Sequence, residues 1–178
     1  MICQEIPSEP SAAPVLVVGA GPAGIVLALE LRWRGVEVTM LAGGMDGLRA
    51  DFQALADAEI ADPARHAPMQ IAVRRALGGT SLLWGGRCVP FDDVDFADRP
   101  HVPLGGWPVS HNNICPWYDV GMRYLNAGTP GFSAPVPSAA ELAECRIDRL
   151  ERWSERRNLR ELHGAALTGD SGLKILLG

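Results

Sequence analysis

The chain has 178 residues and a mass of 19.0 kDa, the size of one ordinary domain. It carries 21 acidic and 16 basic side chains, and no run of Lys or Arg is long enough to follow a nucleic-acid backbone. We therefore expect no nucleic-acid partner. The 20 Gly and 14 Pro predict many turns and long irregular connections, which favours a loop-rich α/β protein.

The cysteines and the apolar segments limit the compartment. The four cysteines are far apart and form no C-x-x-C pair, so they indicate neither a zinc site nor a dithiol redox pair. Scattered free thiols are typical of a reducing compartment. No apolar run reaches the roughly 18 residues that cross a bilayer, and residues 1–14 lack the features of a signal peptide. We expect a cytoplasmic protein with no membrane span and no metal.

The chain begins with a polar stretch. Residues 1–13 contain Pro7 and Pro10 and show no periodicity, so a disordered tail is expected there. Residues 14–178 are expected to form one domain, because the chain has the usual length of a single domain.

The first ordered elements form a β-α-β unit. Val15–Val18 is an aliphatic run typical of a strand buried on both faces, and the glycine-rich turn 19–24 follows it directly. Residues 22–34 have the apolar spacing of a helix. A second buried strand over 36–41 completes a unit of the size expected for two parallel strands with a crossover helix.

Later elements give weaker signals. A short helix is predicted over 48–60, and the dense Gly, Pro and Asp of residues 77–107 predict irregular chain. A helix is predicted from Ser110 to Asn126, with Pro116 in its first turns. Another helix is predicted from Ser138, and a last strand over 173–177. The apolar stripe of that helix consists of Leu142, Cys145, Leu150 and Trp153.

The pattern Gly19-x-Gly21-x-x-Gly24 lies between a strand and a helix, the context that gives this motif its meaning. The first glycine permits the tight turn out of the strand. The second lets the backbone approach a pyrophosphate, and the third lets helix and sheet pack closely. The helix N-terminus offers free N–H groups and a partial positive charge to phosphates. The alternative is a glycine-rich turn without a ligand, which the β-α-β context disfavours.

One expected part of a dinucleotide site is missing. An Asp or Glu about 20 residues beyond the glycines usually accepts hydrogen bonds from the adenosine ribose. Ala42 stands at that position, and Asp46 lies nearby in the following turn without any spacing that requires it to reach. A lost hydrogen bond to a charged acceptor costs about 1.5–3 kcal/mol. The sequence leaves open whether Ala42 abolishes binding.

A second glycine-rich loop covers residues 75–88, Arg-Ala-Leu-Gly-Gly-Thr-Ser-Leu-Leu-Trp-Gly-Gly-Arg-Cys. Glycine removes the side chain that would keep a backbone away from a flat ring, and two hydroxyls and an indole lie beside these glycines. The alternative is a buried turn in which Trp84 belongs to the core.

Together the two loops resemble the glucose-methanol-choline (GMC) family of FAD-dependent oxidoreductases, in which a Gly-Gly-Thr-Ser loop packs beside the isoalloxazine ring. A third block supports the resemblance: Gly106-Trp-Pro108 followed by Pro116-Trp-Tyr118 looks like the family's Gly-Trp-Pro and Pro-Tyr-Tyr steps. Pro22 and Ala23 also resemble the form of the first loop common in flavoproteins, which favours FAD over a nicotinamide.

The resemblance implies the fold, the cofactor and its binding residues. The fold class is α/β, a Rossmann-like FAD-binding βαβ start with loop-rich and helical insertions, incomplete relative to the full family fold. FAD is expected to be noncovalent, because Leu83 stands where some members carry the linking histidine. The implied cofactor-binding residues are Gly19, Gly21, Pro22, Ala23, Gly24, Gly78, Gly79, Thr80, Ser81, Trp84 and Gly85.

The implied function is oxidation of a CH–OH group of an alcohol, sugar or polyol. The family's catalytic histidine lies in a C-terminal part that has no counterpart here, so no catalytic residue is named and the isolated chain is expected to be inactive. Surface positions are expected for His66, His101, His111 and His163. Three alternatives stay open: a truncated or decayed FAD-binding fragment, a subunit that needs a C-terminal partner chain, and another flavoprotein class such as a monooxygenase or reductase.

Overall fold

The structure is a computed structural model that describes residues 2–4, 13–103, 105–133 and 149–178. The chain divides into two compact units. The first unit comprises residues 1–85 and 156–178, and the second unit comprises residues 86–155. The single FAD-binding domain predicted over 14–178 stays a prediction.

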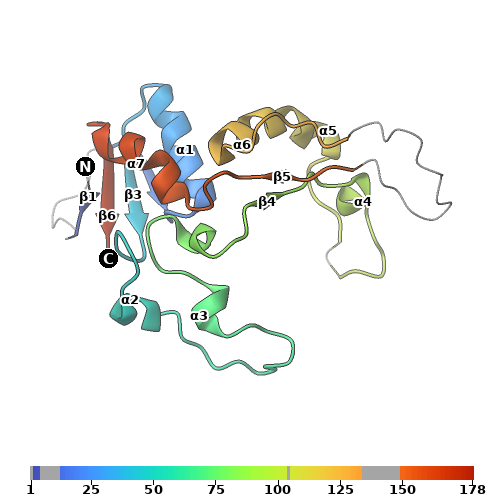
Figure 1. Cartoon of the computed structure of the whole chain (residues 1–178), viewed down its shortest axis with the longest axis horizontal. Coiled ribbons are helices and arrows are strands. Elements are labelled where there is room, and N and C mark those ends of the chain that lie inside the picture. Colours follow the sequence, from blue (N-terminus) through green and yellow to red (C-terminus); the bar gives the residue numbers. More distant parts are fainter. Residues whose placement is uncertain (1, 5–12, 104, 134–148) are drawn as a thin grey trace. The chain divides into compact units, whose positions relative to one another are not determined.

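A four-stranded parallel sheet forms the centre of the first unit (Figure 1). Its order is β1-β6-β3-β2, so the strand at the end of the chain lies beside the second strand of the βαβ unit. The predicted strands over 15–18, 36–41 and 173–177 are confirmed. The strands are β1 (Ile2–Cys3), β2 (Val15–Val18), β3 (Val38–Ala42) and β6 (Leu173–Leu177).

Two helices pack beside this sheet and against each other: α1 (Pro22–Trp33), the predicted crossover helix, and α7 (Leu159–Gly169). Core side chains from both helices and from the sheet are fully buried, among them Ile25, Leu167 and Ile175. α7 is not among the predicted elements. Its signal was present, because the Asn158 side chain caps the helix by accepting a hydrogen bond from Arg160 N, and Glu161 follows three residues after Asn158.

The predicted burial of β2 on both faces is wrong. Val17 is buried, but Leu16 is 56% exposed and Val18 is 77% exposed. β2 is an edge strand of the described sheet, and its alternate side chains point to the side opposite the buried core. An uninterrupted aliphatic run therefore did not distinguish a central strand from an edge strand.

The second unit holds a two-stranded antiparallel sheet and short helices. The sheet pairs β4 (Arg87–Cys88) with β5 (Arg152–Trp153). The predicted helix from Ser110 to Asn126 is present in three pieces, because Pro116 produces a 3₁₀ turn between two α-helical segments. The helical elements are α4 (Asp93–Phe96), α5 (His111–Ile114), η2 (Cys115–Trp117) and α6 (Tyr118–Leu125).

Several further expectations need correction or refinement. The helix predicted from Ser138 is wrong where it can be seen, because Trp153 pairs with Arg87 in an extended strand; residues 134–148 lie outside the described part. The tail predicted over 1–13 contains β1, whose Ile2 lies level with Ile175 of β6, and residues 5–12 also lie outside it. The remaining short helices are α2 (Ala50–Ala54), α3 (Met69–Ala72) and η1 (Gly79–Leu82).

Within the described ranges, no helix is long and apolar enough to cross a membrane.

One ion pair links the end of α1 to the turn before β6. The Arg32 guanidinium donates to Asp170 Oδ1 at 3.0 Å and to the carbonyl of Val36 at 2.9 Å. The hydrogen bond from Arg32 holds the pKa of Asp170 below its usual range. A carboxyl whose pKa is lowered by folding adds stability above its unfolded pKa and loses it as pH falls through the folded pKa.

We expect Asp170→Asn to lower the midpoint of thermal unfolding at pH 7, with a smaller difference from wild type below about pH 4. Differential scanning calorimetry between pH 3 and pH 7 measures this. Asp51→Asn, which removes an exposed Arg49–Asp51 pair, is the control and should change little. An equal decrease of the unfolding midpoint in the two variants would show that the Arg32–Asp170 pair stabilises the fold no more than the exposed Arg49–Asp51 pair does.

Candidate functional site

The first glycine loop, residues 19–24, joins the carboxyl end of β2 to the start of α1, as predicted. The Gly19 N–H donates to the carbonyl of Leu41 at 2.8 Å, which fixes the loop to the end of β3. Pro22 and Ala23 are exposed in the first turn of α1. The first N–H groups of a helix have no acceptor within the helix, so this accessible end can bind an anion.

Two glycines of this loop have different tasks. A Cβ at Gly24 would lie 1.9 Å from the carbonyl oxygen of Gly19, so only glycine lets the helix approach the strand this closely. A Cβ at Gly21 would meet nothing within 4 Å, and its φ of -79° suits any residue. The fold therefore requires Gly24, whereas the open side of Gly21 leaves room for a ligand.

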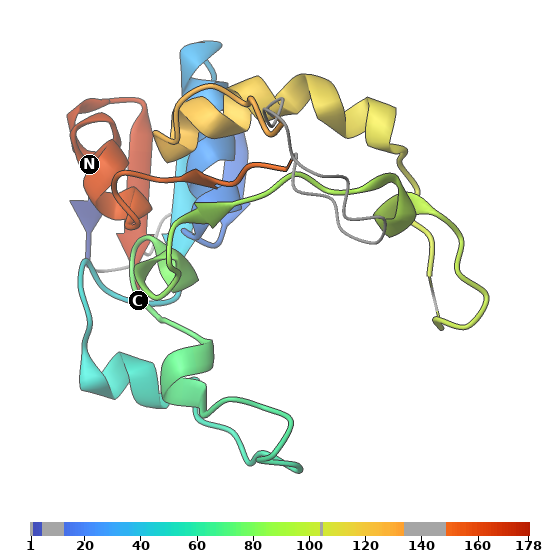
Figure 2. The same cartoon turned by 45° about the vertical axis from the view of Figure 1, so that its right-hand side comes forward.

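The central part of the glycine-rich segment 75–88 is the second glycine loop, residues 78–85, and it lies directly against the first. The Gly78 N–H donates to the carbonyl of Ala20 at 2.9 Å. A Cβ at Gly79 would lie 3.0 Å from the Cα of Gly21. Figure 2 shows this green segment near the end of the sheet where β3 and β6 finish. The structure thus brings together two loops that the sequence predicted separately.

The chain before the second loop is held against the turn after β3. Met45 and Ala76 form a parallel bridge, and the Leu77 N–H donates to the carbonyl of Met45 at 2.9 Å. The buried Gln53 side chain accepts from the Arg75 N–H at 3.2 Å. A Cβ at Gly44 would lie 2.3 Å from the carbonyl oxygen of Arg75. These contacts set the position from which the second loop starts.

The residues predicted to contact the flavin ring differ in whether their polar atoms already have hydrogen-bond partners within the protein. The buried Ser81 hydroxyl donates to the carbonyl of Gly78 at 2.6 Å and accepts from the Leu159 N–H at 3.5 Å. The Trp84 indole N–H donates to the carbonyl of Arg157. Thr80 and Gly85 are exposed. A cofactor contact stays a prediction for each, and the polar groups of Ser81 and Trp84 already have partners within the protein.

Neither Ala42 nor Asp46 supplies a free carboxylate to the ribose edge of the site. Ala42 is buried at the end of β3. Asp46 accepts two hydrogen bonds from Arg160, at 2.6 Å and 2.9 Å, and these hold its pKa below the usual range. The Asp46 carboxylate is therefore bound by Arg160 of α7. Arg160 is not among the predicted site residues, because its pairing with Asp46 follows only from the fold.

The two loops fit the pyrophosphate of a dinucleotide. The helix N-terminus supplies N–H donors, the open side of Gly21 gives the backbone access, and the second loop forms a wall beside it. Small residues at both contact points keep the space free of side chains.

The segment that contains the first glycine loop matches a known protein family. Residues 12–47, which contain β2, the first glycine loop, α1 and β3, match the family described as FAD binding domain. The match confirms the prediction of an FAD-binding portion. The chain is also similar to the crystal structure of pyridoxine 4-oxidase from Mesorbium loti, with 16% sequence identity and a TM-score of 0.48. That similarity covers 93% of this chain and 42% of that one, so the chain spans less than half of its length. No curated protein matches the sequence.

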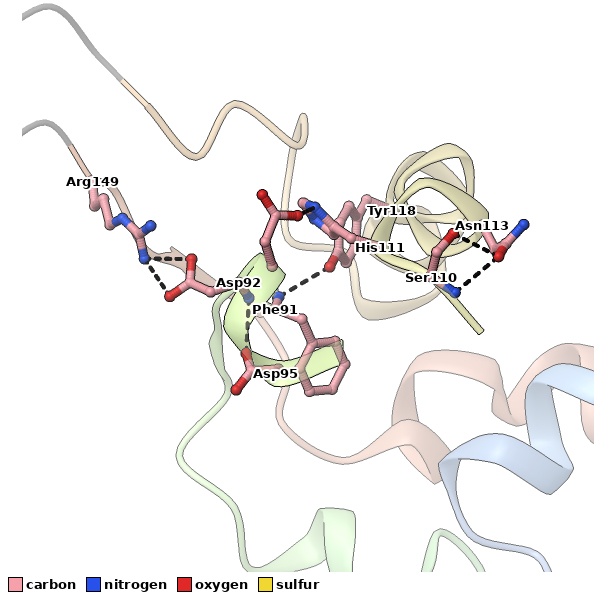
Figure 3. A network of polar contacts seen from close by, with 9 residues as sticks. Phe91, Asp92, Asp95, Ser110, His111, Asn113, Tyr118 and Arg149 are labelled. Carbon is pink, nitrogen blue, oxygen red and sulfur yellow. Dashed lines mark hydrogen bonds and ion pairs between the residues drawn. The ribbon is translucent and has the colours of Figure 1, made fainter. Parts of the chain in front are cut away.

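The second unit contains a polar network that connects its short elements (Figure 3). His111 Nδ1 lies 2.6 Å from Asp93 Oδ1, and the Tyr118 hydroxyl accepts from the Phe91 N–H at 3.0 Å. Asp92 forms an ion pair with Arg149 at 2.6 Å. His111 was expected to be a surface histidine; its side chain is 28% exposed and serves to join α4 to α5.

The Gly-Trp-Pro block takes part in an aromatic cluster of the same unit. The Trp107 ring lies 5.5 Å from Phe91 and 5.6 Å from Phe96, measured between ring centroids. Phe96 also stacks on the His111 ring at 5.6 Å. A surface groove runs beside Phe96, Trp107 and His111.

In the part of the chain that the structure describes, no group of three or more His, Cys, Asp or Glu could hold a metal ion.

The two roles of the first loop can be separated by mutation. We expect Gly24→Ala to destabilise the fold by about 1–3 kcal/mol, because its Cβ meets the Gly19 carbonyl. Gly21→Ala should leave the fold unchanged and weaken dinucleotide binding, because its Cβ extends into open space. Urea unfolding and a binding titration of both variants measure this. A stable, binding-competent Gly24→Ala variant would contradict the close packing.

Ser81→Ala tests the anchoring of the second loop. The change leaves the carbonyl of Gly78 and the N–H of Leu159 without their buried partner, so a loss of about 1–3 kcal/mol in the free energy of unfolding is expected. Thr80→Ala, at the exposed neighbouring hydroxyl, should stay within about 0.5 kcal/mol of wild type. Urea unfolding compares them, and no loss in Ser81→Ala would remove Ser81 from the anchor.

Proposed function

We propose that this chain is the N-terminal, FAD-binding part of a GMC-type oxidoreductase that acts on a CH–OH group of an alcohol, sugar or polyol. The observation that carries the proposal is the contact between the two glycine loops, where the Gly78 N–H donates to Ala20 and Gly79 lies against Gly21. One loop has the geometry of a pyrophosphate cradle. The other is the loop that, by resemblance, lies beside the flavin ring.

In this proposal the protein binds and orients a noncovalently held FAD. The N-terminus of α1 and the open side of Gly21 hold the pyrophosphate. We assign the contact with the ring to the exposed residues of the second loop, Thr80 and Gly85. FAD supplies the acceptor for a hydride from the substrate carbon, and the protein supplies its position and surroundings. No residue of this chain is assigned as the catalytic base.

A second candidate is a subunit that binds FAD and needs a C-terminal partner chain for activity. The exposure of Leu16 and Val18, at 56% and 77%, favours it, because apolar side chains on a strand of a dinucleotide-binding sheet are ordinarily covered. The free thiols of Cys3, Cys88 and Cys115 support a reducing, cytoplasmic location for either candidate.

Titration of the purified full chain with FAD tests the proposal. We expect saturable binding with a Kd below about 100 μM, followed by flavin absorbance and calorimetry. Gly21→Asp should abolish it, because a carboxylate on the open side of Gly21 repels the pyrophosphate and fills its space.

Gly121→Asp is the matched control. It introduces the same carboxylate on α6 of the second unit, also with nothing within 4 Å of the added Cβ, and should leave FAD affinity unchanged. A folded wild-type chain that fails to bind FAD, or equal binding by both variants, would overturn the assignment of the cradle.

A further inference from the structure

An arginine lies at the edge of the site where a dinucleotide fold usually carries an acid. β3 ends at Ala42, and the next residue, Gly43, is exposed. The Arg75 guanidinium lies over Gly43, with one terminal nitrogen 3.1 Å from the position of an added Cβ and Cζ 3.5 Å from it. The missing carboxylate thus has a cation in its place.

The position of this arginine is fixed by its own backbone. The Arg75 N–H donates to the buried Gln53 side chain, and its carbonyl passes 2.3 Å from the position of a Cβ on Gly44. The following residue, Ala76, forms the bridge to Met45. The Gly43-Gly44 pair accommodates both the guanidinium and the backbone that carries it. A side chain at either glycine would force them to shift.

Arg160 and Arg75 both lie at this edge, and among the residues that the structure describes only Arg160 of the two is paired with a carboxylate. Asp46 neutralises Arg160 with two hydrogen bonds. Arg75 has no ion pair with any carboxylate in the described ranges, and its Nε is buried without a hydrogen-bond partner. An uncompensated guanidinium therefore lies beside the exposed Gly43, which follows the end of β3. The first glycine loop is bonded to the same end of β3 through Gly19 and Leu41.

The replacement of an acceptor by a donor changes what the ribose edge can recognise. A carboxylate accepts hydrogen bonds from the ribose hydroxyls and repels a phosphate attached to them. A guanidinium only donates, and it matches the geometry of phosphate oxygens with two parallel bonds. It also donates to a hydroxyl oxygen, so a plain ribose is still bound.

We propose that Arg75 recognises the adenosine ribose of the bound dinucleotide, and that the site consequently prefers an adenosine with a 2′-phosphate over one without it. The proposal rests on the proposed function for the placement of the dinucleotide across the two loops. The inference goes beyond the proposed function, because it predicts that the adenosine end of the site accepts an additional anion, which FAD does not carry.

Calorimetric titration of the full chain with 2′,5′-ADP and with 5′-ADP tests the preference. We expect the wild-type chain to bind 2′,5′-ADP at least about tenfold more tightly. Arg75→Gln should abolish the difference, and Arg75→Lys should keep a smaller one because it retains the charge without the fork. Arg74→Gln, the same change at the adjacent arginine, is the control and should keep the full preference.

The outcomes separate this proposal from the function on which it rests. Equal or tighter binding of 5′-ADP by the wild type, or a preference that survives in Arg75→Gln, overturns the role of Arg75. If FAD binds in the parallel titration, the proposed function stands in that case. If neither FAD nor either nucleotide binds to a chain shown by circular dichroism to be folded, both proposals are overturned.

Discussion

The candidate site depends on the close approach of three stretches of backbone. The carbonyl of Ala20 accepts from Gly78, Gly79 lies against Gly21, and the chain at Arg75 passes against Gly44. Each approach is possible because a glycine has no Cβ at the point of contact. The turns after β2 and β3 and the second loop therefore hold one another at the carboxyl edge of the sheet, where parallel α/β folds bind their ligands.

Charge at this edge is set by a helix that belongs to the far end of the chain. α7 places Arg160 against Asp46, and its first N–H group, at Leu159, donates to Ser81 below the second loop. The Asp46 carboxylate, the predicted candidate for the ribose edge, thereby has both of its oxygens bonded to Arg160. The start of α1 is exposed, and the partly buried guanidinium of Arg75 has no ion pair in the described ranges. Both favour an anionic ligand.

The Gly-Trp-Pro block and the helix after it contribute packing and capping contacts to the second unit. Trp107 of the Gly-Trp-Pro block packs with Phe91 and Phe96, and the helix that follows is capped by Ser110 and Asn113. The polar network around His111 joins short helices that have too few residues to be stable alone. These contacts explain the residue types as requirements of folding.

The βαβ unit, its glycine loop and the last strand could be predicted from the sequence, because strand hydrophobicity, helix spacing and glycine position are local signals. The sequence did not determine α7 as an element, the split of the 110–126 helix into three pieces, or the extended pairing of Trp153 with Arg87. The contact between the two loops, the partner of Asp46 and the placement of Arg75 over Gly43 were decided only by the tertiary structure. These depend on residues far apart in the chain, and no local pattern specifies which backbone will pass within contact distance of another.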